Sequence, residues 1–239
     1  MLAIVAAHVI PPTAFALIHG AATDRPRGIA VFSALCLTIG SAAEITSLRT
    51  GFPFGRYYFT GVMGPKFLGV PYLLALAYLG MGYLSWTLAR IILGPLSGRR
   101  LIAVPALAAA LMTAWDLSCD PVWSTIGHAW IWLDGGPYFG VPLSNFTGWY
   151  LTAFLYYLLF ALYLRGRETK LRAPGMAIVM YAISAAGNLL LVIPPPLVPK
   201  IADPSGALWR FSQITGGCAL VSVLVMGGFT CWAWRCLPR

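Results

Sequence analysis

The chain has 239 residues, of which 59% are hydrophobic and 10% are charged, and its mean hydropathy is +0.78. A soluble domain of this size does not need so much apolar sequence, so a membrane-embedded helix bundle is expected. The net charge of +9 would suit a nucleic-acid-binding protein, but the basic residues fall mainly between the apolar runs, which argues against that class.

Seven apolar runs, each near the length that crosses a bilayer, follow one another along the chain. About 20 apolar residues span the hydrocarbon core as a helix, and runs this long do not fit the strands of a membrane barrel. We therefore expect an all-α integral membrane protein forming one domain over residues 1–239. The first run lacks a basic start and an obvious cleavage site, so we expect it to remain as a helix. The predicted transmembrane helices are 2–20, 28–48, 69–92, 101–119, 146–164, 174–193 and 211–234.

The distribution of basic residues predicts the orientation of this bundle. With the N-terminus outside and the C-terminus in the cytoplasm, most basic residues fall on the inner side, as the positive-inside rule requires. The inner set is Arg25, Arg27, Arg90, Arg99, Arg100, Arg165, Arg167, Lys170, Arg172, Arg235 and Arg239. The outer set is Arg49, Arg56, Lys66, Lys200 and Arg210. We predict a multi-pass protein of the plasma membrane, with attraction to anionic lipid as a by-product of its charge.

Two copies of one short phrase mark an internal repeat. Residues 64–71 read GPKFLGVP, and residues 136–142 read GPYFGVP. Glu44 lies 21 residues before the first proline of the first phrase, and Asp116 lies 21 residues before that of the second. Because the segments 28–92 and 100–164 would run through the membrane in the same direction, we predict a parallel repeat of helices two and three in helices four and five.

Carboxyl groups in apolar sequence are costly and mark candidate functional sites. Asp116 and Asp120 are one helical turn apart, so both face one side if the helix continues to residue 120. Pro121 disfavours helical geometry at Asp120, so the alternative is that Asp120 ends the helix. Two carboxyl groups this close in apolar surroundings favour one of them keeping its proton, as a general acid must.

Spacing alone leaves structural roles open for these acids. The two aspartates could instead bond Arg49, Arg56 or backbone amides. Glu44 could reach the outer interface or pair with Arg49. At the position equivalent to Asp120, the first copy of the repeat has Leu48.

Other reactive residue types give weaker signals. His8 and His19 share a similar face of the first helix, but no spacing resembles a metal site. Asn145 and Asn188 are amides at membrane depth, where hydrogen bonding between helices is their usual role. The lysines all fall outside the predicted helices, which excludes a retinal Schiff base. The scattered cysteines are expected to be reduced, small, buried apolar residues: Cys36, Cys119, Cys218, Cys231 and Cys236.

The order and density of these motifs resemble the CruF-type carotenoid biosynthesis family over about residues 25–165. The resemblance rests on AAE at 42–44, RTGFPFGRY at 49–57, GP at 64–65, LGVP at 68–71, WDL at 115–117, DP at 120–121, YFGVPLSNF at 138–146 and GW at 148–149. Members of that family are membrane hydratases that add water to the terminal double bond of acyclic carotenoid ends. The resemblance therefore implies a carotenoid hydratase, although residues 122–134 depart from the family pattern.

Hydration of an isolated alkene needs a proton donor, a base that holds water, and stabilisation of a tertiary cation. We expect Asp116 to be the donor, Asp120 to tune it, and Glu44 to hold water and take its proton; the reverse roles of Glu44 and Asp116 stay open. The candidate substrate-binding residues are Phe52, Phe54, Arg56, Tyr57, Tyr58, Trp115, Asn145 and Trp149. Aromatic faces among them can stabilise a cation.

We expect no cofactor, because hydration is redox-neutral. The expected partners are a carotenoid dissolved in the bilayer, water, the lipid itself and other carotenoid biosynthetic enzymes, and no nucleic acid. Two alternatives stay open at this stage. One is a carotenoid or lipid binder or carrier without catalysis, and the other is a cyclase of carotenoid end groups, which uses the same protonation but excludes water.

Overall fold

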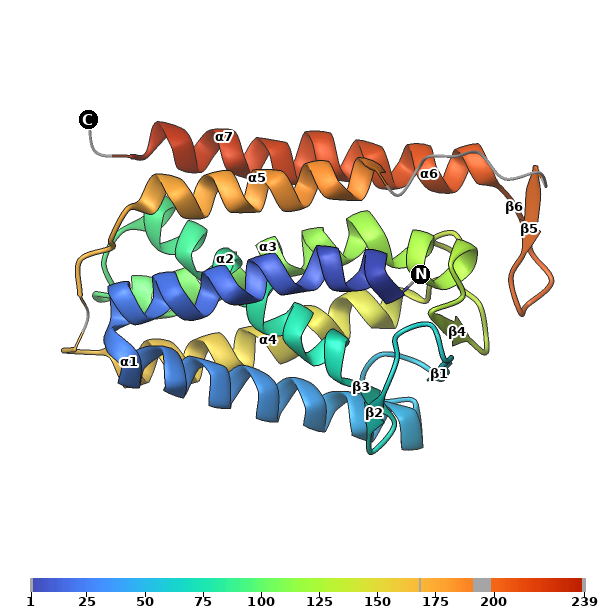
Figure 1. Ribbon diagram of the computed structural model, residues 1–239, viewed down its shortest axis with the longest axis horizontal. Helices are drawn as coiled ribbons and strands as arrows, with labels where there is room; N and C mark the ends of the chain where they lie inside the picture. The colour runs from blue at the N-terminus through green and yellow to red at the C-terminus, as the bar shows by residue number, and fades with distance from the viewer. Residues whose placement is uncertain (1, 168, 191–198, 238–239) are drawn as a thin grey trace.

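The computed structural model describes residues 2–167, 169–190 and 199–237, so the end of the predicted helix 174–193 and Arg239 lie outside the described residues. Helices lie side by side in the described part, and short hairpins gather at one end of them (Figure 1). The helices are α1 (Leu2–Thr50), α2 (Tyr72–Leu93), α3 (Arg100–Pro121), α4 (Leu143–Leu164), α5 (Pro174–Leu190), α6 (Phe211–Leu220) and α7 (Gly227–Arg235). Two π-helical turns, η1 (Val122–Ile126) and η2 (Val221–Met226), follow α3 and α6. The prediction of an all-helical protein is confirmed.

Within the described residues, five helical segments are long and apolar enough to cross a membrane. They are Leu2–Thr50, Tyr72–Leu93, Arg100–Ile126, Leu143–Leu164 and Phe211–Arg235. The helix α5 is also apolar, but its described part has 17 residues. These segments make the chain a multi-pass membrane protein by length and composition.

The long helix α1 reverses direction near its middle. Arg25 has non-helical dihedral angles (φ 64°, ψ 163°), and Pro26 follows it. Figure 1 shows the two arms of α1 running in opposite directions, which places them where the helices 2–20 and 28–48 were predicted. Five long apolar segments neither establish nor exclude seven membrane crossings. The number of crossings therefore remains a prediction.

Both copies of the repeated phrase fold into the same tight turn. In the first copy, β2 (Lys66–Phe67) pairs with β3 (Val70–Pro71), and in the second an isolated bridge joins Tyr138 to Val141. The two residues inside each turn have positive φ, with values of 49° and 89° in the first copy and 53° and 90° in the second. This is the conformation of two-residue hairpin turns, in which glycine is favoured. In both copies a proline then precedes the first residue of a helix, α2 or α4.

Two further strand pairs cover the same end of the bundle. The strand β1 (Tyr57–Phe59) pairs antiparallel with β4 (Trp130–Trp132), so the two long loops are joined to each other. The strand β5 (Lys200–Ala202) pairs antiparallel with β6 (Leu208–Arg210). Because side chains alternate along a strand, Tyr57 and Phe59 are buried while Tyr58 is exposed. The β1–β4 pair thus turns aromatic side chains inward over the ends of the helices.

The opposite end of the bundle holds a buried ion pair. Arg90 Nη1 of α2 donates to Asp24 Oδ1 of α1 at 2.9 Å, and both side chains are almost fully buried. Arg90 Nη2 also donates to the Thr169 carbonyl at 3.0 Å. Arg90 was predicted among the basic residues of the inner side, and the structure shows that it also neutralises a buried acid of α1. His19 nearby lies 2.8 Å from the Tyr83 hydroxyl, as a hydrogen-bonded core histidine does.

The cysteines are all free, but they are not all buried. Cys36, Cys119 and Cys218 are buried as predicted, whereas Cys231 and Cys236 are exposed. Cys231 lies on α7 and Cys236 directly after it, and much of this helix faces away from the rest of the described chain. The expectation of small buried residues was therefore wrong for these two positions.

Candidate active site

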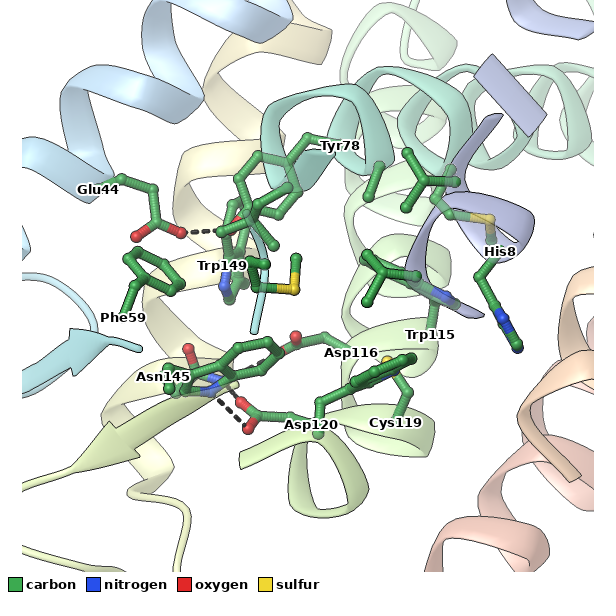
Figure 2. A pocket seen from close by; sticks show the side chains of 18 of the residues that line it. His8, Glu44, Phe59, Tyr78, Trp115, Asp116, Cys119, Asp120, Asn145 and Trp149 are labelled. Atoms are coloured by element: carbon green, nitrogen blue, oxygen red, sulfur yellow. Dashed lines mark hydrogen bonds between the residues drawn. The ribbon is translucent and has the colours of Figure 1, made fainter. Parts of the chain in front are cut away.

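A cavity of about 900 Å³, counting the part that opens to the surroundings, lies among α1, α2, α3, α4 and α5 beneath the paired strands β1 and β4. All three predicted catalytic acids line it (Figure 2). The other lining residues are Val5, His8, Val9, Pro12, Phe54, Tyr57, Phe59, Met63, Leu74, Ala77, Tyr78, Met81, Trp115, Cys119, Trp123, Trp130, Trp132, Asn145, Trp149, Ser184 and Asn188. The cavity thus brings together residues from both copies of the predicted repeat.

Glu44 of α1 is buried and accepts two hydrogen bonds from tyrosines. The donors are the hydroxyl groups of Tyr57 in β1 and Tyr78 in α2. Burial, and then the adjacent Glu44 carboxyl, raise the pKa of Tyr57 above its usual value, so its hydroxyl stays protonated and can donate. The tyrosines occupy the place that the sequence alternative gave to Arg49.

Asp116 and Asp120 face the same cavity from successive turns of α3. The Nδ2 atom of Asn145 donates to Asp116 Oδ2 at 2.8 Å and to Asp120 Oδ2 at 2.7 Å (Figure 2). Asp120 Oδ1 also accepts from the indole nitrogens of Trp130 at 3.0 Å and Trp132 at 3.2 Å. One amide therefore holds the two carboxyl groups together, and Asp120 receives three N–H donors.

No basic side chain among the described residues pairs with the three acids. The ion pairs found in the described residues join Arg56 to Asp134 and Arg90 to Asp24. A buried carboxylate with no cation beside it is expensive, so its hydrogen bonds must be good and the number of negative charges small. The described residues also contain no group of three or more His, Cys, Asp and Glu side chains placed to bind a metal.

The helix α3 continues past Pro121, which keeps Asp120 on the same face as Asp116. A proline has no N–H for the carbonyl four residues before it, here that of Leu117. The Tyr138 hydroxyl donates to this carbonyl at 2.9 Å. The wider π-helical turn η1 then follows, and such turns are frequent at functional sites. The alternative in which Asp120 ends the helix is therefore wrong.

Aromatic side chains form the wall beside the acids. The Trp149 ring stacks on Phe54 with centroids 4.8 Å apart, and it also contacts Tyr78 at 4.3 Å. Trp115 lines the cavity next to Asp116 in sequence and is labelled with it in Figure 2. These rings surround the polar end with electron-rich faces.

The structure separates the predicted substrate-binding residues into two groups. Those that line the cavity are Phe54, Tyr57, Trp115, Asn145 and Trp149. Phe52 is 73% exposed and Tyr58 is 49% exposed, and neither lines the cavity. Arg56 also lies outside the cavity wall, because its exposed guanidinium group pairs with Asp134 beside the β1–β4 strand pair.

Three residues that the sequence did not single out hold the acids in place. Tyr78 bonds Glu44, and Trp130 and Trp132 bond Asp120. A signal for Tyr78 existed, because it follows the last proline of its phrase by seven residues, as Trp149 does in the second copy. The alternation Trp-Ile-Trp at 130–132 is likewise typical of a strand with one aromatic face.

Much of the remaining cavity wall is apolar. Val5, Val9 and Pro12 of α1 contribute to it, and His8 of the same helix lies across from Glu44 in Figure 2. The His8 ring nitrogen Nε2 is 3.2 Å from the carbonyl oxygen of Gly187, which links the first arm of α1 to α5. The cavity therefore suits an apolar molecule that contacts the acids.

The chain belongs to the family of carotenoid biosynthesis proteins, whose family model matches residues 3–195. This confirms the family resemblance predicted from the motifs. Among curated proteins, a bisanhydrobacterioruberin hydratase of Haloarcula japonica is 30% identical over 138 residues. The matched region is 57% of this chain and 45% of that protein, so the chain spans less than half the length of this relative. No solved structure matches the chain.

Proposed function

We propose that the protein is a carotenoid hydratase that adds water across the terminal C=C bond of an acyclic carotenoid end group and forms a tertiary alcohol. Membership of the carotenoid biosynthesis family and the name of the related hydratase support this substrate class. The observation that carries the proposal is the arrangement of the cavity. Three carboxyl groups that pair with no basic side chain among the described residues line an otherwise mainly apolar cavity.

The hydrogen bonds divide the roles of the two aspartates. Asp120 accepts from three N–H groups, none of which can accept a proton in return, so this environment suits a carboxylate. Asp116 accepts from the single donor Asn145, and a second negative charge one turn away from Asp120 would be costly. We therefore assign Asp116 as the proton donor and Asp120 as the anion that helps to stabilise the developing cation.

Glu44 is assigned to the water. The proton of Asp116 forms a C–H bond at the alkene carbon that bears one hydrogen, and the π bond breaks to leave a tertiary cation. Water forms the C–O bond to that cation, and its proton passes to Glu44. Net charge is unchanged, and a proton that returns from Glu44 to Asp116 through water resets the site without a cofactor. Cation–π contacts with Trp149 and Trp115 would contribute up to about 2 kcal/mol in a desolvated site.

The same proposal includes seven membrane crossings and an internal repeat. The two arms of α1, then α2, α3, α4, α5 and the α6–α7 segment would each cross once, with the N-terminus outside in the plasma membrane. An odd number of crossings agrees with the described chain beginning and ending at opposite ends of the bundle (Figure 1). The equal turns of the two phrases, and the antiparallel pairing of β1 with β4 from equivalent loops, support the repeat. The two copies of the repeat differ at one position of the site: the second copy has the acid Asp120 where the first copy has Leu48.

The proposal is tested by expressing the chain in a host that makes acyclic carotenoids. The molecular masses of the extracted pigments are then measured by mass spectrometry. A gain of one water per reacted end group is the expected result. Pigment that binds but keeps its mass and structure would favour a carrier. An end group of unchanged mass that has closed into a ring would favour a cyclase, and either outcome would contradict hydration.

A further inference from the structure

A second cavity of about 480 Å³, counting its open part, lies on the other side of Trp132. Its lining residues are Ser124, Thr125, His128, Ile131, Trp132, Gly140, Ala202, Asp203 and Pro204. They come from η1, the β4 strand, the second phrase and the β5–β6 hairpin, and His128, Ala202 and Pro204 are exposed. This cavity therefore lies among the loops at the end of the bundle rather than among the spanning helices.

Trp132 is the residue that lines both cavities. Its indole nitrogen donates to Asp120 Oδ1 at 3.2 Å. The π-helical turn η1 completes the wall, because Trp123 lines the acid cavity while the next residue, Ser124, lines the second cavity. Ser124 Oγ donates to the backbone carbonyl of Asp120 at 2.8 Å. A single side chain and one helical turn thus separate Asp120 from the second cavity.

The second cavity is lined by polar groups that can hold water. Besides Ser124 it contains the hydroxyl of Thr125, the His128 ring and the carboxyl group of Asp203. Burial opposes ionisation of Asp203, but hydrogen bonds from Ser205, Trp209 and the Ala207 amide outweigh it and hold the pKa of Asp203 below its usual value. A charged carboxylate and several hydroxyl groups give water the two to four partners that an ordered site needs.

We infer that the second cavity stores and supplies the water for hydration, and that Trp132 is the partition past which water reaches the acids. The inference rests on the proposed function. A polyene that fills the apolar cavity from the lipid side displaces water from that side, yet the cation at its end must meet water. A separate polar route from the end of the bundle where the loops lie would bring water to the cation while the polyene fills the apolar cavity. It would also keep water away from the rest of the polyene.

The chemistry of the cation gives a direct measure of water supply. In D2O, deuterium from Asp116 adds to the alkene carbon and leaves a tertiary cation. The cation then either gains water, to form the deuterated alcohol, or loses a proton from a carbon next to it, to return an alkene that carries deuterium. The ratio of exchanged alkene to alcohol therefore rises when water supply is restricted, while protonation itself is unaffected.

The test compares two substitutions that act on the second cavity in opposite directions. Ala202→Phe narrows its opening from the β5 strand, and Ile131→Ala enlarges it without removing a hydrogen-bonding side chain. Ile201→Phe is the matched control, because the side chain of this neighbouring strand residue does not line the second cavity. Membranes containing each variant are incubated with an acyclic carotenoid in D2O, and the alcohol and the recovered alkene are analysed by mass spectrometry.

We expect Ala202→Phe to lower the rate of alcohol formation by about tenfold, which corresponds to an activation barrier about 1.4 kcal/mol higher. The same variant should raise the ratio of exchanged alkene to alcohol. Ile131→Ala should lower that ratio, and Ile201→Phe should leave both quantities at the wild-type value. An unchanged ratio in both cavity variants, or exchange that falls together with hydration, would overturn the water route and leave the hydratase proposal standing. Wild-type protein that gives neither alcohol nor exchange would contradict the proposed function itself.

Discussion

At the scale of single residues, Asn145 gains the most definite role from the structure. The sequence placed it among the candidate substrate-binding residues and left interhelical hydrogen bonding as the usual alternative. Its amide lies between the carboxyl groups of Asp116 and Asp120 and donates to both. A carboxyl pair bridged by one neutral amide can hold one proton and one charge in a fixed geometry, which is what a general acid beside a stabilising anion requires.

The first prediction concerns the proton donor. Asp116→Asn keeps the size of the side chain and removes its acidic proton, so hydration is expected to fall by about a hundredfold or more. The rate of alcohol formation in membranes measures this effect. Asp134→Asn, which alters an exposed carboxylate outside the cavity, should keep wild-type activity. Activity of Asp116→Asn close to that of Asp134→Asn would refute the assignment of the donor.

A second prediction concerns the hydrogen bonds to Glu44. Tyr78→Phe removes one of its two donors, so the water-holding carboxyl group is less well placed and hydration should fall by about tenfold. Tyr72→Phe is the control, because Tyr72 lies on the same helix but is exposed. The rate should be measured together with the thermal unfolding of both purified variants. Lost stability with an unchanged rate would mean that the hydroxyl of Tyr78 has only a structural role.

At the scale of elements, the path of α3 through Pro121 depends on a side chain from another loop. Tyr138→Phe would leave the Leu117 carbonyl without the hydroxyl that it accepts from. Loss of a partner by a part-buried carbonyl costs about 1–3 kcal/mol, so the variant should unfold at a lower temperature in detergent. Tyr58→Phe removes an exposed hydroxyl and should change stability little. Equal melting temperatures for the two variants would show that the hydrogen bond from Tyr138 to the Leu117 carbonyl does not stabilise the helix at Pro121.

Some secondary-structure elements could be predicted from the local sequence, and others could not. The turns of the two phrases were predictable, because a glycine that can take a positive φ and a proline two residues later restrict the backbone at the site itself. The end of α3 was predicted at residue 119, since Pro121 disfavours helix locally. The prediction stopped short because the group that compensates for the proline, Tyr138, lies 21 residues after Leu117. Contacts of this kind leave no trace in the local pattern.

At the scale of the whole molecule, the ion pair of Asp24 with Arg90 fixes the reversal of α1 against α2. Asp24→Asn would leave the guanidinium group buried without its carboxylate, and breaking a buried pair in this way typically costs about 3–5 kcal/mol. Thermal unfolding in detergent should therefore show a large loss of stability. The double variant Asp24→Asn/Arg90→Met should recover part of the loss, because it also removes the buried positive charge. A single variant as stable as the wild type would contradict this prediction.

The sequence by itself determined the membrane class and the family and pointed to the three acids as candidates, because apolar run length, motif order and the cost of a carboxyl group in lipid are properties of the chain alone. Only the tertiary structure decided how the acids are held and what surrounds them. Pairing of β1 with β4 brings Trp130 and Trp132 to Asp120, and the same alternation turns Tyr58 outward. The β1–β4 pairing joins segments more than seventy residues apart, so it follows from how the loops pack over the bundle and not from any local pattern.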